Sequence, residues 1–188
     1  EVIVKQGSPA SNALFLSKGL AKVYIEGASG RGFILFIARP GKMITGPGGY
    51  TGSRNTYSVS ALTPVNACFV NFSIFRHLAR TNGRFAEGML EDISAESLND
   101  HRRLFNLTHK KMPGRLAETL LYLADEIFCS DEFDILLSRQ ELGEIASMAK
   151  ESVVRIMKEF SIEGIISYRS SRMKINDRHK LIDIAGEG

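Results

Sequence analysis

Apolar and polar positions change their spacing twice along the chain. Up to about residue 72, short apolar runs alternate with turn signals rich in Gly, Pro and Ser. Many short strands at near-regular spacing are typical of an antiparallel barrel or jelly roll, so we expect one in this part. The predicted strands are residues 1–4, 13–16, 20–25, 32–37, 43–45, 57–61 and 65–71.

The spacing then becomes helical. Ser73 is the predicted N-cap of a short helix over residues 73–80, and a longer helix follows over residues 84–110. Pro113 cannot continue that helix, but it suits the first turn of the next one, residues 113–128.

The long predicted helix carries a row of side chains at three- and four-residue spacing. This row predicts a seam that packs in parallel against the same helix of a twofold-related copy. Polar Ser97 and Asp100 interrupt the row, so packing of the helix on its own barrel alone is the alternative. The seam residues are Leu90, Ile93, Ser97, Asp100, Leu104 and Leu107.

Two further helices are predicted within residues 137–172. Ser138 and Glu141 have the spacing of a capping box at the start of a helix over residues 139–146. A break at Ser147-Met148 leads into a second helix, about residues 150–163. Apolar residues at helical spacing let the two helices share one small core, made of Leu142, Ile145, Val153, Ile156, Met157 and Phe160.

The second of these helices ends at Gly164, and a hairpin is predicted after it. Residues 165–168 can pair with residues 173–175 across a Ser170-Ser171 turn. The pattern is that of a helix-turn-helix followed by a basic wing. The helix points Lys150, Glu151, Ser152 and Arg155 outward, and such side chains suit phosphates and base edges.

Composition is ordinary for a globular protein, with 44% hydrophobic and 24% charged residues, and a net charge of only +3. The distribution of charge is more informative, because basic residues gather at residues 101–115 and 164–180.

Cys68 and Cys129 are far apart, which predicts two buried free thiols in a reducing cytosol. The chain opens on a predicted strand without Met, so we expect residues upstream of Glu1.

Two classes of function are excluded by what the sequence lacks. No apolar run reaches the roughly 18 residues of a membrane span, so no membrane partner is expected. An enzyme with a cupin-like barrel needs clustered His and carboxylate ligands, and no His lies in the strand half. We therefore expect no catalysis and no metal site.

The predicted elements follow one another in a specific order: a barrel, a long helix, a hinge, a helix and a winged helix-turn-helix. This order resembles the cyclic-AMP receptor protein and FNR (Crp/Fnr) family of bacterial transcription regulators. The resemblance is strongest in GRLAETLLYLA (114–124), LSRQELGEIA (137–146) and KESVVRIMKEFSIEGII (150–166), and looser in residues 4–24 and 39–46. It implies an α+β fold with three parts. They are an N-terminal β-roll, a cyclic-nucleotide-binding-like double-stranded jelly roll (1–81), a long dimerisation helix (82–110) and a winged helix-turn-helix DNA-binding domain (111–188).

The resemblance also implies roles at the DNA. Glu151 and Arg155 are similar to the family's base readers, and they lie four residues apart, so that they can also pair with each other in the free protein. Arg can donate to O6 and N7 of guanine, and Glu can accept from the amino group of cytosine. Lys150, Ser152 and Val154 would read bases beside them. The backbone contacts would come from Ser138, Arg139, Gln140, Arg169 and Arg172.

The implied partners are double-stranded DNA, a second copy of the chain and RNA polymerase. A twofold dimer predicts a pseudo-palindromic operator with GA/TC-type half-sites, in the style TTGA…TCAA or TGTGA…TCACA.

The sensor part departs from the cyclic-nucleotide-binding members. Their Gly-Glu pair reads Gly46-Pro47 here, and their Arg-Ser/Thr pair reads Asn55-Thr56. A carboxylate for the ribose and a guanidinium for the phosphate are therefore missing, and cyclic AMP is not expected. The candidate effector pocket is Gly46, Gly48, Gly49, Arg54, Asn55, Thr56, Asp100 and His101.

The sequence does not identify the effector. The glycine-rich loop 46–52 can form a backbone-amide anion site or be a plain surface loop. Two cysteines cannot hold an iron–sulfur cluster alone, whereas haem would need an axial ligand such as His77, His101 or His109. The alternatives are an unknown small-molecule effector, a haem-based gas sensor, and a constitutive DNA-binding regulator with a vestigial sensor.

Overall fold

The computed structural model describes residues 1–27, 30, 32–44, 46–51 and 54–187. The chain forms two compact units, Glu1–Leu104 and Phe105–Gly188, and their boundary falls inside the long helix α3 (Gly83–His109). The division at residues 81 and 110 stays a prediction.

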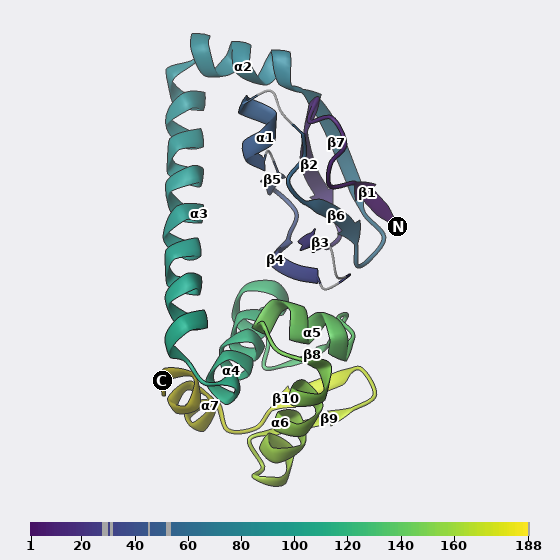
Figure 1. The fold of residues 1–188 in the computed structure, drawn as a ribbon, viewed down its shortest axis with the longest axis vertical. Helices are drawn as coiled ribbons and strands as arrows, with labels where there is room; N and C mark the ends of the chain where they lie inside the picture. Colours follow the sequence, from purple (N-terminus) through teal and green to yellow (C-terminus); the bar gives the residue numbers. More distant parts are fainter. Residues whose placement is uncertain (28–29, 31, 45, 52–53, 188) are drawn as a thin grey trace. The chain divides into compact units, whose positions relative to one another are not determined.

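The first unit is built from two antiparallel sheets, as the strand pattern predicted (Figure 1). One sheet has the order β1-β6-β3-β4 and the other has the order β5-β2-β7. Thr45, at the end of one predicted strand, lies outside the described residues. The strands are β1 (Val2–Val4), β2 (Asn12–Lys18), β3 (Ala21–Glu26), β4 (Gly32–Ala38), β5 (Met43–Ile44), β6 (Ser58–Ala61) and β7 (Asn66–Asn71).

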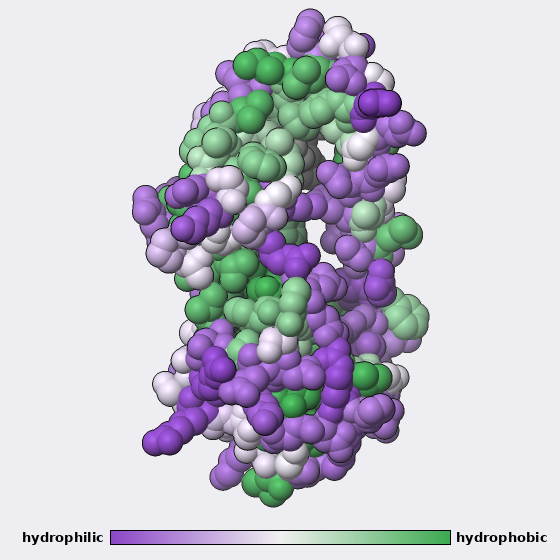
Figure 2. Space-filling model, turned by 180° about the vertical axis from the view of Figure 1, so that it is seen from behind, coloured by the Kyte–Doolittle hydropathy of each residue, from purple (hydrophilic) through white to green (hydrophobic). Residues whose placement is uncertain are grey.

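Apolar side chains of both sheets form the core of the first unit. The buried members are Leu14, Leu16, Ala21, Val23, Ala38, Ile44, Tyr57 and Val59. A second cluster joins Ala13 to α2 (Phe72–Thr81), and Phe85 and Met89 of α3 pack against it. Val2, Phe69 and Ile74 remain largely exposed, and Figure 2 shows apolar surface on this unit.

Two predictions in the first unit were wrong. The stretch 46–52 was predicted as a loop, but the short helix α1 (Gly46–Thr51) forms there. The N-cap of α2 is Asn71 rather than Ser73, because the Asn71 side chain accepts a hydrogen bond from the Ser73 amide at 2.8 Å.

The second unit packs four α-helices and a π-helix around a small sheet of order β8-β10-β9. The face of this unit seen in Figure 2 is mostly hydrophilic. The elements are α4 (Met112–Tyr122), the π-helix η1 (Leu123–Phe128), β8 (Glu132–Asp134), α5 (Arg139–Ala146), α6 (Lys150–Ile162), β9 (Ile166–Arg169), β10 (Arg172–Ile175) and α7 (Arg178–Gly186).

Three features of the second unit differ from expectation. No strand was predicted over residues 130–134, but β8 forms there because Phe133 is buried and pairs with Met173 of β10. The helix predicted over 113–128 changes to π geometry at Leu123. Helix α7 was not predicted.

The cysteine prediction was half right. Cys68 and Cys129 are both free thiols, but both are exposed rather than buried. Cys68 lies on the edge strand β7, and Cys129 has a left-handed backbone (φ 51°) after η1. Among the described residues, no helix has the length and apolar character needed to cross a membrane.

Candidate nucleic-acid interface

Helix α5 starts and ends as its sequence predicted. The Ser138 hydroxyl accepts from the Glu141 amide at 3.2 Å, and the Glu141 carboxylate accepts from the Ser138 amide at 2.8 Å. This capping box is confirmed. At the other end, Ser147 adopts a left-handed conformation (φ 52°) that turns the chain into α6.

Gly143 makes this turn tight. A Cβ at Gly143 would lie 2.5 Å from the carbonyl oxygen of Met148, closer than real Cβ atoms come to a backbone oxygen. The Met148 amide in turn donates to the Gly143 carbonyl at 2.9 Å. Glycine at this position therefore lets α5 and α6 approach closely, and the sequence reading did not single it out.

Helix α6 separates a buried face from an exposed one. Its buried face is Val153, Ile156, Met157 and Phe160, which is the predicted set. The predicted base readers lie on the other side: Ser152 is half-buried, and the other four, Lys150, Glu151, Val154 and Arg155, are exposed.

The ion pair expected between Glu151 and Arg155 does not form. Arg155 Nη1 instead lies 2.8 Å from Glu159 Oε1, one turn further along α6. Both acids are four residues from Arg155, so spacing alone does not choose between them. Glu151 lies in the first turn, where the free amides of the helix already stabilise a carboxylate.

The predicted backbone contacts at the start of α5 already have partners within the second unit. Ser138 is held in the capping box, and Gln140 donates to Glu144 at 3.3 Å. The Arg139 guanidinium lies 5.3 Å from the ring centroid of Tyr168 on β9, a cation–π contact. This contact connects α5 with the wing.

The two wing arginines differ. Arg169 is exposed, whereas Arg172 donates to Glu132 at 3.1 Å and to Asp134 at 3.3 Å, both on β8. The hydrogen bond to Glu132, followed by the other contacts with these two acids, raises the pKa of Arg172. A phosphate contact from Arg172 would therefore form beside these carboxylates or in exchange for them.

Arg115 of α4 joins two parts of the second unit. Its guanidinium donates to the carbonyls of Ala146 (3.1 Å) and Ser147 (3.2 Å) at the turn before α6. It also donates to the carbonyls of Leu107 (3.4 Å) and Lys110 (3.1 Å) at the end of α3. Because these partners lie far apart in the sequence, spacing did not reveal this residue.

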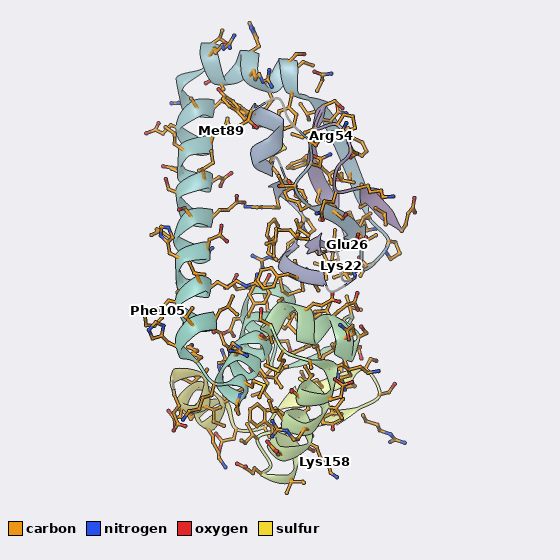
Figure 3. The ribbon with its side chains drawn as sticks, in the orientation of Figure 1. Lys22, Glu26, Arg54, Met89, Phe105 and Lys158 are labelled. Carbon is orange, nitrogen blue, oxygen red and sulfur yellow. The ribbon has the colours of Figure 1, made fainter. Side chains whose placement is uncertain are left out.

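The predicted effector pocket is dispersed. Arg54 Nη1 donates to the carbonyl of Gly7 at 2.7 Å, and Figure 3 shows Arg54 among the strands of the first unit, on the side away from α3. Asn55 donates to the Ser8 hydroxyl at 3.0 Å, and Thr56 is exposed. The Arg54 and Asn55 side chains therefore hold the loop after β1.

The glycines of the predicted pocket and the polar pair Asp100-His101 lie on two helices. Gly46, Gly48 and Gly49 belong to α1, while Gly52 lies outside the described residues. A Cβ at Gly49 would collide with the ring of Phe72, so close packing explains this glycine. Asp100 and His101 are both exposed on α3.

Other residues connect α3 with the sheets of the first unit. Glu96 forms an ion pair with Lys42 at 2.6 Å. Arg103 donates to the carbonyls of Ile34 and Leu35 and stacks over Phe33. Burial, followed by the negative charge of Glu96, raises the pKa of Tyr57. No spacing or motif in the sequence predicted these contacts.

The seam residues are mostly exposed. Leu90, Ile93, Ser97, Asp100 and Leu104 are exposed, whereas Leu107 is half-buried in the second unit. Leu98 and Phe105 are further exposed apolar side chains of α3, and Phe105 points away from the helix axis in Figure 3.

The three histidines considered as haem ligands are all exposed. His77 and His101 belong to the first unit, and His109 belongs to the second, where its ring stacks on Phe105 at 4.1 Å. Within the part of the chain that the structure describes, no three His, Cys, Asp or Glu side chains are grouped to hold a metal ion.

Comparison with known proteins covers both units. A family model described as cyclic nucleotide-binding domain matches residues 1–82, and one described as Crp-like helix-turn-helix domain matches residues 114–184. The cAMP-activated global transcriptional regulator CRP of Salmonella typhimurium is 27% identical over 169 residues, covering 88% of this chain and 80% of that protein. Electron transport regulator A of Shewanella oneidensis is 25% identical over 190 residues, covering 99% and 76%.

A solved structure shows the same architecture. FixK2 from Bradyrhizobium japonicum superposes with a TM-score of 0.87 at 18% identity, covering 98% of this chain and 92% of that one. This likeness confirms the predicted α+β fold of a β-sheet domain, a long helix and a helix-turn-helix. With both family models matched in that order, the chain belongs to the Crp/Fnr family of DNA-binding transcription regulators.

Proposed function

We propose that the protein is a homodimeric regulator that reads a pseudo-palindromic operator through α6. Glu151 and Arg155 read base edges, Lys150, Ser152 and Val154 contact bases beside them, and the start of α5 and the wing contact the backbone. The half-sites are of the GA/TC type. Bound at a promoter, the dimer contacts RNA polymerase.

The observation that carries the proposal is the exposed face of α6. Its four exposed members, Lys150, Glu151, Val154 and Arg155, lie opposite a face that buries four apolar side chains in the small core. A helix anchored in this way can enter the major groove without loss of its own packing. The exposed apolar side chains of α3 support the dimer, because a parallel twofold mate would bury them.

Selection of bound DNA from a random pool tests the proposal. Replacement of Arg155 by Ala should relax selection at one base pair in each half-site, at a cost of about 1–3 kcal/mol there. Lys180→Ala, which removes an exposed cation on α7, is the control and should leave the selected sequence unchanged. An Arg155→Ala protein that selects the same sequence as the unmodified chain would contradict the assignment.

The dimer has its own test. Ile93→Glu places a charge on the exposed row of α3, where a parallel mate would have to bury it. Sedimentation should show the unmodified chain as a dimer and this variant as a monomer. Glu91→Gln, an exposed change on the same helix, should leave the dimer intact.

We further propose that an effector other than cyclic AMP modulates DNA binding. Arg54 is committed to the Gly7 carbonyl, and position 47 holds Pro where the family's ribose-binding carboxylate would stand. The alternatives are constitutive binding and a haem-based sensor. DNA affinity should change less than about twofold with added cyclic AMP but more with the cognate ligand. An absorption spectrum of the purified protein tests haem.

A further inference from the structure

Arg155 is held by an acid on its own helix face. Its Nη1 donates to Glu159 Oε1 at 2.8 Å, and both side chains are about half exposed (55% and 46%). The described residues give no hydrogen bond between Arg155 and Glu151, the other acid four residues away. Because its partner is Glu159, the Arg155 side chain is turned toward the carboxyl end of α6 in the free protein.

The bond occupies only one edge of the guanidinium. Arg recognises guanine with two parallel N–H groups that donate to O6 and N7. With Nη1 bound to Glu159, the edge formed by Nε and Nη2 has no partner among the described residues and can make that pair of bonds. A guanidinium held in one orientation also loses less conformational freedom when it binds.

Neutralisation is the second consequence of the pair. A free arginine on this face would attract any phosphate, which increases affinity for every sequence. Glu159 offsets the charge of Arg155 within 2.8 Å, so the general attraction is weaker. A guanine edge presented to Nε and Nη2 still gains both hydrogen bonds.

We propose that Glu159 is a specificity-determining positioning residue, which orients Arg155 for a guanine and suppresses its binding to other DNA. The inference rests on the proposed role of Arg155 as a base reader. It adds that Glu159 matters for discrimination without contact to a base.

Two substitutions separate orientation from charge. Glu159→Ala removes both the carboxylate and the acceptor, whereas Glu159→Gln removes the charge but keeps an amide oxygen that can accept from Arg155. Glu163→Gln is the matched control, because Glu163 is an exposed acid at the end of the same helix and pairs with Lys180 at 2.8 Å. All three changes are made in the full chain.

The measurement is affinity for the selected operator and for the same operator with the Arg155-dependent base pair replaced, at several salt concentrations. For Glu159→Ala we expect the ratio of the two affinities to fall about two- to fivefold, the range of an exposed ion pair. Non-specific affinity should rise. Glu159→Gln should restore most of the ratio, Glu163→Gln should leave it unchanged, and thermal stability should not differ among the variants.

Each result has one meaning. An unchanged ratio in Glu159→Ala, with an Arg155→Ala protein that does lose selectivity, overturns the role of Glu159 alone. Equal losses in Glu159→Ala and Glu159→Gln overturn the orienting role of Glu159, because the loss of its charge alone would then account for the effect. An Arg155→Ala protein with unchanged selectivity instead contradicts the proposed function itself.

Discussion

The two units use their arginines differently. In the first unit, Arg54, Arg76 and Arg103 all donate to main-chain carbonyls of that unit. In the second unit, Arg155 and Arg172 are bound to exposed carboxylates on side chains.

This difference separates fixed cations from exchangeable ones. A guanidinium bound to a main-chain carbonyl cannot leave for a ligand without depriving the fold of a hydrogen bond. A guanidinium in an exposed ion pair can exchange one anion for another at small cost. Arg155 and Arg172 of the second unit are thus suited to phosphates and bases, whereas Arg54, Arg76 and Arg103 hold the chain of the first unit itself. Arg115 is the exception, because it binds four carbonyls within the second unit.

The largest effect is expected from Arg115→Ala. The change removes the donor to four carbonyls at the end of α3 and at the turn before α6. We expect a loss of about 3 kcal/mol in the free energy of unfolding of the second unit, because a charged hydrogen-bond network is broken. Urea unfolding followed by circular dichroism measures it.

Arg172→Ala is the matched control for this prediction. It removes the same side chain from the same unit, but from exposed carboxylates, so its effect on unfolding should be far smaller. Similar losses in the two variants would contradict the distinction between fixed and exchangeable cations.

Gly143→Ala tests the tight turn between α5 and α6 in the unit that carries the exchangeable cations. The added Cβ would meet the Met148 oxygen at 2.5 Å, so the turn between α5 and α6 must shift. Overpacking against backbone should cost about 2 kcal/mol, and operator affinity should fall with it. Gly88→Ala meets no atom within 4 Å on α3 and should be neutral or stabilising. Equal melting temperatures for the two variants would show that the turn is not tight.

The sequence predicted local features of the fold well, because they depend on neighbours in the chain. The capping box at Ser138, the length of α6 and its buried face follow from spacing alone. Strand β8 was missed because three residues with polar ends carry no strand signal. β8 forms because Phe133 pairs with Met173, forty residues further along the chain, and is buried there.

The candidate site was predictable to the same extent. Periodicity found which side chains of α6 are exposed, but it could not choose between Glu151 and Glu159 as partners of Arg155. In the first unit, the resemblance to the family predicted which nucleotide-binding residues are missing. Spacing could not show that Arg54 is bound to Gly7, because that contact joins residues 47 positions apart in the sequence.

Alkaline pH tests the burial of Tyr57 in the first unit. Its pKa is raised in the folded protein, so the unfolded chain releases the phenol proton first as pH increases. The contribution of Tyr57 to the free energy of unfolding is complete below about pH 10. Above that pH it decreases by about 1.4 kcal/mol per pH unit, up to the pKa of Tyr57 in the folded protein. Urea unfolding between pH 8 and 11 should show this loss. It should disappear in Tyr57→Phe but persist in Tyr50→Phe, whose phenol is about half exposed.

The smallest effect distinguishes the two wing arginines. Arg169 is exposed, whereas Arg172 is already bound to Glu132 and Asp134. Each phosphate neutralised by a cation adds about 0.9 to the slope of log affinity against log salt concentration. Arg169→Ala should therefore lower this slope by about 0.9 for each wing that touches DNA. Arg172→Ala should lower it less, because Glu132 and Asp134 already compensate the charge of Arg172. A larger loss of slope in Arg172→Ala than in Arg169→Ala would mean that DNA replaces both carboxylates and that Arg172 neutralises a phosphate in full.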